Sequence, residues 1–272
     1  MTAVFAAWLP AALLGAGGFG WLRRAQYPAF VATLLAALTM AQAGLLMAIM
    51  QPGHSLWLAL GIAAVAAGAT VFAERENARH VIVFGGSLAA IQICDPLGGL
   101  VVAGLLPATV AVAQARSDLR KAAGLYALLL FLPAMTAGLL FYLSRFDHVS
   151  VQQFLPAAGP VAAMNLPMRL ALSATPVLAA APALALLMRV KRLHPVVLVA
   201  LAAVLASAIA ACNGAVREPV ALIAAAAPLS LAAIAAWPQS SARDTKALAA
   251  AGLCTALSWA ILFLYAPPMV SG

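Results

Sequence analysis

One apolar stretch, residues 81–115, limits what this chain can fold into more than any other feature. Its 35 residues contain a single charged side chain, Asp95, near the middle. One helix of this length would be about 50 Å long, whereas the hydrocarbon core of a membrane is about 30 Å thick. Two full membrane spans would need about 40 residues. The sequence therefore predicts two short helices that meet at residues 94–99, CDPLGG, where Asp-Pro and Gly-Gly interrupt regular structure.

The composition of the whole chain is that of an integral membrane protein. The 272 residues are 65% hydrophobic and 8% charged, whereas soluble domains carry about 25% charged residues. We interpret the net charge of +8 as basic loops at a membrane surface and not as a nucleic-acid site. No CxxC motif, metal-ligand cluster or phosphate-binding loop is recognisable in the sequence, so no cofactor or metal is expected.

The predicted fold is all-α: a polytopic transmembrane helix bundle of ten spans in a single domain, residues 1–272. Each segment is apolar all round, because a helix in lipid must satisfy its backbone groups internally. The first segment has no basic residues before its apolar run, so it is interpreted as a span and not as a signal peptide. The expected spans are 3–22, 28–50, 56–72, 81–94, 97–115, 122–143, 166–188, 195–211, 219–237 and 247–265.

The distribution of basic residues predicts the orientation of these spans. Alternate loops hold 12 of the 15 basic residues, and such loops face the cytoplasm. This predicts that both termini lie outside, in a bacterial inner membrane. It also places Asp95 at the outer face, because the basic loops on either side of residues 81–115 require an even number of crossings. The residues of the basic loops are Arg23, Arg24, Arg75, Arg79, Arg116, Arg120, Lys121, Arg189, Lys191, Arg192, Arg243 and Lys246, whereas Arg145, Arg169 and Arg217 fall on the other side.

Asp95 and Arg169 are the strongest candidates for a functional site. Each lies at the membrane end of an apolar span without an opposite charge within five residues. Burying either charge alone is costly, so a mutual pair is favoured. The pair has two interpretations: an ion pair that locks the helices together, or a catalytic acid, Asp95, beside a phosphate-binding arginine. The expected substrate-binding set at the outer face is Arg169, Asn165, Arg145, Asp147 and His148.

Several other residues are given structural roles. Trp21 and Trp237 at inner ends and Trp57 at an outer end fit an aromatic belt that anchors the protein in lipid. The charged inner loops are expected to contact anionic lipid headgroups. Cys94 and Cys212 both fall at outer ends, and a disulfide between them requires those ends to be adjacent.

Residues 27–143 resemble the membrane part of the C-type glycosyltransferases, which take sugars from polyprenyl-phosphate donors at the outer face. The resemblance lies in QPGHSLWLALGIAAVAAG, in the Gly-rich pair GSLAAIQICDPLGGLVVAGLLPA and in LYALLLFLPAMTAGLLFYLSR, separated by basic inner loops. Members of that family carry an acidic catalytic residue in a long first outer loop, and many have Lys or Arg at the apex. This chain has no acid before Glu74, which is predicted inside, and has Asp95 at the apex. The resemblance implies a shortened relative that serves as a scaffold, or an enzyme that uses Asp95, Asp147 or Glu218.

Three functions follow as hypotheses. The first is a scaffold or accessory subunit of a membrane complex, with other membrane subunits as partners. The second is an outer-face transferase that acts on a sugar linked to a polyprenyl-phosphate lipid. The third is a small-solute transporter, which the sequence disfavours because the second half of the chain has no counterpart of the CDPLGG break.

Overall fold

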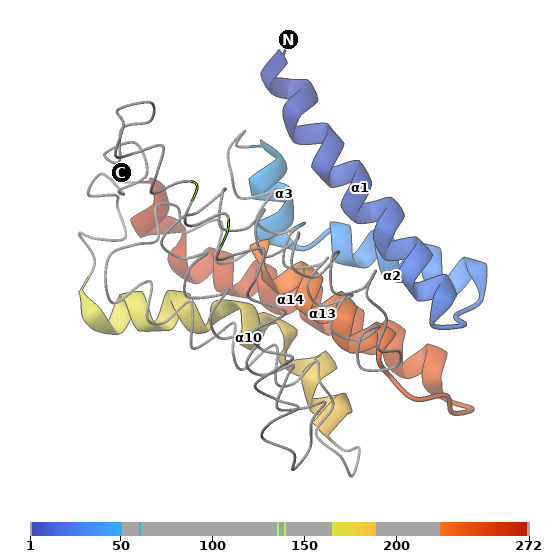
Figure 1. The fold of residues 1–272 in the computed structure, drawn as a ribbon. Coiled ribbons are helices and arrows are strands. Elements are labelled where there is room, and N and C mark those ends of the chain that lie inside the picture. Colours follow the sequence, from blue (N-terminus) through green and yellow to red (C-terminus); the bar gives the residue numbers. More distant parts are fainter. Residues whose placement is uncertain are drawn as a thin grey trace.

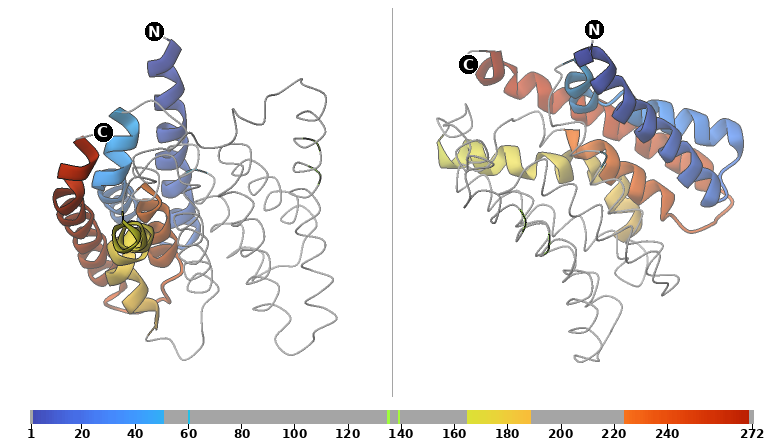
Figure 2. Two further views of the ribbon diagram at one scale, coloured as in Figure 1. Left: turned by 90° about the vertical axis from the view of Figure 1, so that its left-hand side faces the viewer. Right: turned by 45° about the horizontal axis from the view of Figure 1, so that its top comes forward.

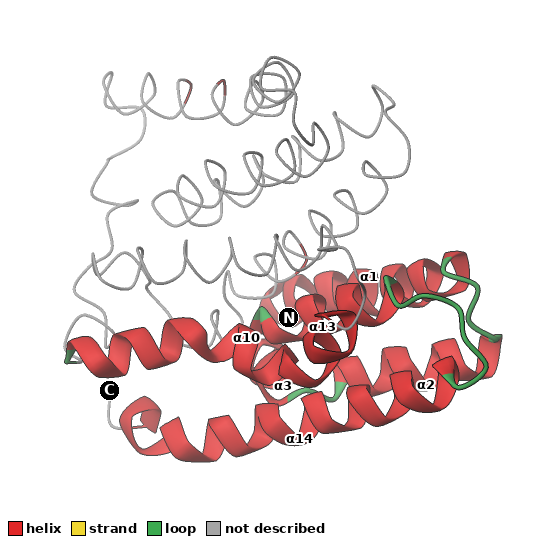
Figure 3. Ribbon diagram, turned by 90° about the horizontal axis from the view of Figure 1, so that it is seen from below, coloured by secondary structure: helices red, strands yellow, loops and turns green. Residues whose placement is uncertain are grey.

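The structure is a computed structural model that describes residues 2–50, 165–188 and 224–270 and the single positions 60, 135 and 139. All regular secondary structure in these ranges is α-helical (Figure 3). The helices are α1 (Thr2–Arg24), α2 (Ala29–Met40), α3 (Ala43–Met50), α10 (Leu166–Met188), α13 (Ala226–Ala235) and α14 (Arg243–Val270).

The short helix α13 is the centre around which the other described helices pack (Figure 1, Figure 2). All ten of its residues are buried. It contacts α1, α2, α3, α10 and α14. Five of its ten residues are alanine, and small side chains allow neighbouring helices to approach closely. At about 15 Å in length, α13 is too short to cross the hydrocarbon core of a membrane by itself.

The long helix α14 buries small side chains and exposes large apolar ones. Its buried positions recur every three or four residues, as expected for one face of a helix. In a water-soluble protein the large apolar side chains would be inside. Small residues between helices and large apolar residues outside are typical of helices that face lipid. The buried set includes Ala247, Ala250, Ala251, Cys254 and Ser258, and the exposed set includes Leu253, Leu257, Phe263 and Leu264.

Helix α1 also has one buried face and one face of exposed large apolar side chains. Ala11, Leu14, Gly18 and Leu22 lie on its buried face, whereas Trp8, Leu9, Leu13 and Phe19 are exposed. At Gly18 the backbone of α1 approaches α13 so closely that an added Cβ would lie 2.9 Å from Leu231 Cδ2.

Two described helices are long and apolar enough to cross a membrane, the segments Leu166–Leu187 and Arg243–Leu264. The pair α2 and α3 passes the same test as a unit, with a bend of 65° between the two helices. Within the described ranges there are thus two spanning helices by length and composition, or three if the bent pair forms one span.

Four of the expected spans correspond to described helices, and a fifth is divided in two. The bounds of α10 coincide with those of the expected span 166–188, and α1 covers the segment 3–22. Helix α14 begins four residues before the expected start at 247, and α13 lies within 219–237. The segment 28–50, in contrast, contains two helices and a break. The expected spans 56–72, 81–94, 97–115, 122–143 and 195–211 lie outside the described residues except for positions 60, 135 and 139, so the number of spans and the sides of the termini stay predictions.

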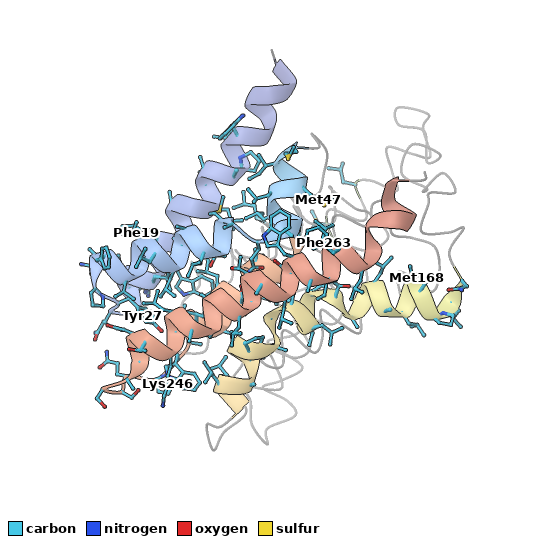
Figure 4. The ribbon with its side chains drawn as sticks, turned by 180° about the vertical axis from the view of Figure 1, so that it is seen from behind. Phe19, Tyr27, Met47, Met168, Lys246 and Phe263 are labelled. Atoms are coloured by element: carbon cyan, nitrogen blue, oxygen red, sulfur yellow. The ribbon has the colours of Figure 1, made fainter. Side chains whose placement is uncertain are left out.

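The loops α1–α2 and α13–α14 meet at one end of the bundle, which we call the basic end (residues 23–28 and 236–246). Figure 4 shows Tyr27 and Lys246 together at this end. Arg243 Nη1 donates a hydrogen bond of 2.9 Å to the carbonyl of Ala25, and Gln239 Nε2 donates to Gln26 Oε1. The positive-inside rule places Arg23 and Arg243 on the same side of the membrane. The structure brings the α1–α2 and α13–α14 loops, in which these residues lie, together.

Helix α1 ends in a Schellman motif. The Gln26 N–H donates to the Arg23 carbonyl at 2.9 Å, and the Tyr27 N–H donates to the Leu22 carbonyl at 3.1 Å. Gln26 has a positive φ of 67°, the left-handed conformation that this motif requires and that glycine adopts most readily. Leu22 and Tyr27 are both fully buried and belong to the same core cluster, which is the hydrophobic contact that commonly accompanies the motif.

Tyr27 connects the basic end to the central helix. Its hydroxyl donates a hydrogen bond of 2.8 Å to the carbonyl of Ile234 in α13. The guanidinium carbon of Arg243 lies 3.8 Å from the centre of the tyrosine ring. Burial raises the pKa of Tyr27 above its ordinary value of 10.0, and the positive charge of Arg243 only partly offsets this effect.

Trp21 and Trp237 are the two described residues of the expected aromatic belt, and their contact with lipid stays a prediction. Both are only partly buried, and both pack against the main core cluster, which draws residues from α1, α2, α10, α13 and α14. The indole Nε1 of Trp237 is buried and has no hydrogen-bond partner among the described residues. Their rings therefore contribute to helix packing at the basic end. Trp57, the third residue of the expected belt, lies outside the described residues.

Candidate functional site

The break between α2 and α3 falls at Ala41 and Gln42. Ala41 caps α2 with φ −80° and ψ 0°, and α3 begins at Ala43. No proline stands in the α2–α3 segment, and its one glycine, Gly44, lies within α3. Apart from proline and glycine pairs, a sharp bend in a helix arises at a π-bulge or where a side chain or water inserts into the ladder of backbone hydrogen bonds, and side chains are found at this break.

Those side chains come from α14. Thr255 Oγ1 donates to the carbonyl of Leu38 at 2.9 Å, and Trp259 Nε1 donates to the carbonyl of Ala41 at 3.1 Å. Ser258 Oγ accepts the N–H of Ala43 at 3.0 Å. The three side chains share one face of α14, because residues three and four apart are neighbours on a helix. A broken helix in lipid needs such replacements for its freed backbone groups, and α14 supplies three of them.

Gln42 is the polar side chain at the centre of the break. It is only 2% exposed. Its Nε2 donates a hydrogen bond of 2.7 Å to Ser230 Oγ in α13, and Ser230 Oγ donates to the carbonyl of Ala227 at 2.8 Å. The Oε1 atom of Gln42 is buried and has no hydrogen-bond partner in the part of the chain that the structure describes. An unpaired buried acceptor costs about 1–3 kcal/mol, so this atom requires an explanation.

Ser230 follows an interruption in the backbone hydrogen bonds of its own helix, although the backbone itself stays helical, since Ala225 has φ −64° and ψ −16°. Residue 224 is helical, Ala225 is a turn, and α13 begins at Ala226. Pro228 accounts for the interruption, because it has no N–H for the carbonyl four residues earlier and its ring crowds that carbonyl. The next amide, the N–H of Leu229, makes only a long contact of 3.4 Å with the Ala225 carbonyl. The Gln42–Ser230 hydrogen bond therefore joins the α2–α3 break to a helix whose backbone hydrogen bonds are interrupted at Pro228.

The depth of this cluster follows from helix lengths. The 12 residues of α2 extend about 18 Å from the basic end. Ser258 lies 15 residues after the first residue of α14, or about 22 Å along it. If the basic end marks one membrane surface, both values place the break inside a hydrocarbon core of about 30 Å.

The predicted site residues are only in part described. Asn165 stands directly before α10, is exposed, and accepts the N–H of Met168 on Oδ1 at 3.1 Å. This is the geometry of a helix N-cap, so Asn165 has a local structural role. The backbone of Arg169 lies in the first turns of α10. Asp95, Arg145, Asp147 and His148 lie outside the described residues, as do Cys94 and Cys212. The catalytic role of Asp95 and the substrate-binding roles of Arg169, Asn165, Arg145, Asp147 and His148 stay predictions.

The sequence analysis did not single out the residues at the break. Gln42 is the one amide side chain in the expected span 28–50, and this was a usable signal. Thr255, Ser258 and Trp259 share a helix face in an otherwise apolar segment, which was a second. In the described ranges, no three His, Cys, Asp or Glu side chains gather as metal ligands would. No protein-family model, curated protein or solved structure matches this chain, so the resemblance to C-type glycosyltransferases stays a prediction.

Proposed function

We propose that this protein is a transporter of a small polar solute in the bacterial inner membrane, with the break between α2 and α3 as its binding region. The observation that carries the proposal is Gln42. Its buried amide lies between the two parts of a broken helix, bonds to a second interrupted helix, and leaves Oε1 without a described partner.

The break between α2 and α3 has an energetic cost. A continuous helix over residues 29–50 would satisfy its own backbone, whereas the bent pair depends on three side chains of α14. Irregular backbone at membrane depth is retained where it is buried in protein or lines a polar cavity. In transporters, discontinuous helices of this kind form the solute and ion sites near the membrane midplane.

The sequence disfavoured a transporter because the second half of the chain has no counterpart of the CDPLGG break, and residues 94–99 lie outside the described residues. The structure adds a different pairing, since α13 comes from the second half of the chain and its Ser230, just after the interruption in hydrogen bonding at Pro228, bonds to Gln42. The two interruptions have different local causes, proline in one case and inserted side chains in the other. They support a site between two parts of the chain without implying an internal repeat.

The experiment is uptake into vesicles, preceded by purification in mild detergent with mass spectrometry of all bound molecules. Vesicles that contain the wild-type protein are incubated with a mixture of small polar metabolites, and the metabolites that enter are identified. Vesicles that contain Gln42→Leu are treated in the same way for comparison. Gly17→Ala is the matched control, because Gly17 is exposed on α1 and an added Cβ there meets nothing within 4 Å.

We expect at least one solute to accumulate with wild-type protein and with Gly17→Ala, and to be lost with Gln42→Leu. Stoichiometric partner proteins and no uptake would instead favour the scaffold hypothesis. A bound polyprenyl-phosphate lipid without uptake would favour the outer-face transferase, with Asp95 and Arg169 as the next residues to change.

A further inference from the structure

Among the described groups around the break, one side-chain acceptor, Gln42 Oε1, is left unused, whereas the hydroxyl donors are all committed. The hydroxyl of Ser230 donates to the carbonyl of Ala227, and that of Ser258 donates to the carbonyl of Thr255. The hydroxyls of Thr39 and Thr255 likewise donate to the carbonyls of Leu35 and Leu38. Each hydroxyl has one hydrogen, so all four are committed to the backbone.

The same network agrees with the orientation of the Gln42 amide. Ser230 Oγ donates to the Ala227 carbonyl and accepts from Gln42 Nε2. With the amide assigned in this way from its hydrogen bonds, Oε1 is the unpaired atom. The unpaired atom, Gln42 Oε1, is therefore an acceptor, and a ligand that binds to it must be a hydrogen-bond donor or a cation.

An anion is excluded by the amides of α3. The N–H of Ala43 bonds to Ser258, and the N–H groups of Leu45 and Leu46 both bond to the carbonyl of Gln42. Three of the first four amides of α3 are thus occupied, and the helix N-terminus does not offer the free donors that an anion needs. A divalent cation would require carboxylate ligands, and the residues named around the break are all uncharged.

We infer that Gln42 Oε1 is a ligand of a small monovalent cation bound at the break. This inference rests on the proposed function, since a cation at this position would accompany the solute. Uncharged oxygen ligands suffice for monovalent cations in membrane proteins, where carbonyl groups replace the hydration shell. Unwound backbone and the carbonyl ends of half-helices coordinate coupling ions in transporters, and Gln42 directly follows the carbonyl end of α2.

Sodium ion is the probe for the test. The full-length protein in detergent is melted in choline chloride and in NaCl at equal ionic strength, with tryptophan fluorescence as the signal. A ligand that binds only the folded state raises the melting temperature, by about 3 °C when its concentration is roughly tenfold above Kd. We expect this rise for wild-type protein. We expect none for Gln42→Leu, and for Gln42→Glu the same rise at about tenfold lower sodium, because a carboxylate adds a full charge.

The control is Thr33→Val, which changes an exposed hydroxyl of α2 that bonds only to its own helix and should leave the sodium response intact. A wild-type melting temperature that is the same in both salts would overturn the inference, and would indicate that Oε1 holds a water molecule. An equal response in Gln42→Leu would also overturn it. If Gln42→Leu does not fold, the comparison of wild type with Gln42→Glu decides.

The two proposals fail in different ways. Uptake that depends on Gln42 but not on sodium would overturn the cation site and leave the transporter proposal standing. A rise in melting temperature with sodium that depends on Gln42, without uptake of any solute, would overturn the transporter proposal and leave the cation site standing.

Discussion

Arg243 holds its guanidinium carbon 3.8 Å from the centre of the Tyr27 ring, and Arg243 Nη1 bonds to Ala25 in the same loop. A positive charge in the first turn of a helix opposes the helix dipole, and Arg243 is the first residue of α14. Its side chain is nevertheless only 6% exposed. The tyrosine ring and the carbonyl of Ala25 therefore offset both the dipole and the burial, and fasten the start of α14 to the end of α1.

The hydroxyl of Tyr27 provides the first prediction. Tyr27→Phe keeps the ring beside Arg243 but removes the hydrogen bond to Ile234. We expect a loss of about 1 kcal/mol in the free energy of unfolding, because the Ile234 carbonyl still accepts the N–H of Trp237. Tyr27→Ala empties a fully buried position and should cost about 3–5 kcal/mol. Thermal melts in detergent measure both, and equal losses would contradict the importance of the ring.

The raised pKa of Tyr27 predicts a dependence on alkaline pH. Below pH 10 the phenol is protonated in the folded and unfolded states, and its contribution to stability is fully present. Above pH 10 the unfolded phenol ionises first, because burial raises the pKa in the folded state, and stability is lost as the pH rises toward the folded pKa. The melting temperature of the wild type should fall more steeply above pH 10 than that of Tyr27→Phe. Parallel pH profiles would show that Tyr27 is not responsible.

Gln26 offers a stabilising change. It adopts a positive φ of 67° at the position of the Schellman motif where glycine is preferred. Gln26→Gly should raise the free energy of unfolding by up to about 1 kcal/mol, since glycine relieves the left-handed conformation. The hydrogen bond to Gln239 that it removes is exposed and worth little. A lower melting temperature for Gln26→Gly would mean that this exposed bond matters more than the backbone conformation.

Three single glycine-to-alanine substitutions in α1 test its contact with α13. Gly18→Ala would place its Cβ 2.9 Å from Leu231, whereas Gly17→Ala and Gly20→Ala meet nothing within 4 Å. Alanine is favoured over glycine in a helix by up to about 1 kcal/mol, so the two controls should be neutral or stabilising. Overpacking at position 18 costs about 1–3 kcal/mol. Gly18→Ala should therefore melt below both controls, and equal melting temperatures would show that Leu231 moves aside freely.

The α2–α3 break depends on Ser258. Ser258→Ala leaves the N–H of Ala43 without its partner, which should cost about 1–3 kcal/mol. Thr33→Val is again the control, because that exposed hydroxyl bonds only within α2. Hydrogen exchange at the Ala43 amide gives a local readout: we expect faster exchange in Ser258→Ala and no change in Thr33→Val. Unchanged exchange in both would show that α14 does not hold the break.

The sequence was a good guide where structure depends on local hydropathy. The expected segment 166–188 coincides with α10, and the all-helical class holds for the described ranges. The break at Ala41 and Gln42 was not predicted, because neither residue disrupts a helix by itself. Its cause lies in Thr255, Ser258 and Trp259, more than 200 residues away in the chain. Side chains from another helix leave no periodic signal in the segment that they bend.

The burial of α13 on all sides has a consequence for how the protein is made. A helix of ten residues, shorter than the membrane is thick, gains little from entering lipid alone. The chain order provides its surroundings in advance, since α1, α2, α3 and α10 precede it. Helix α14 follows it in the chain. Because α14 leaves the ribosome after α13, it encloses α13 and completes the α2–α3 break only at that stage, so a chain truncated before residue 243 would reach the membrane with both features unfinished.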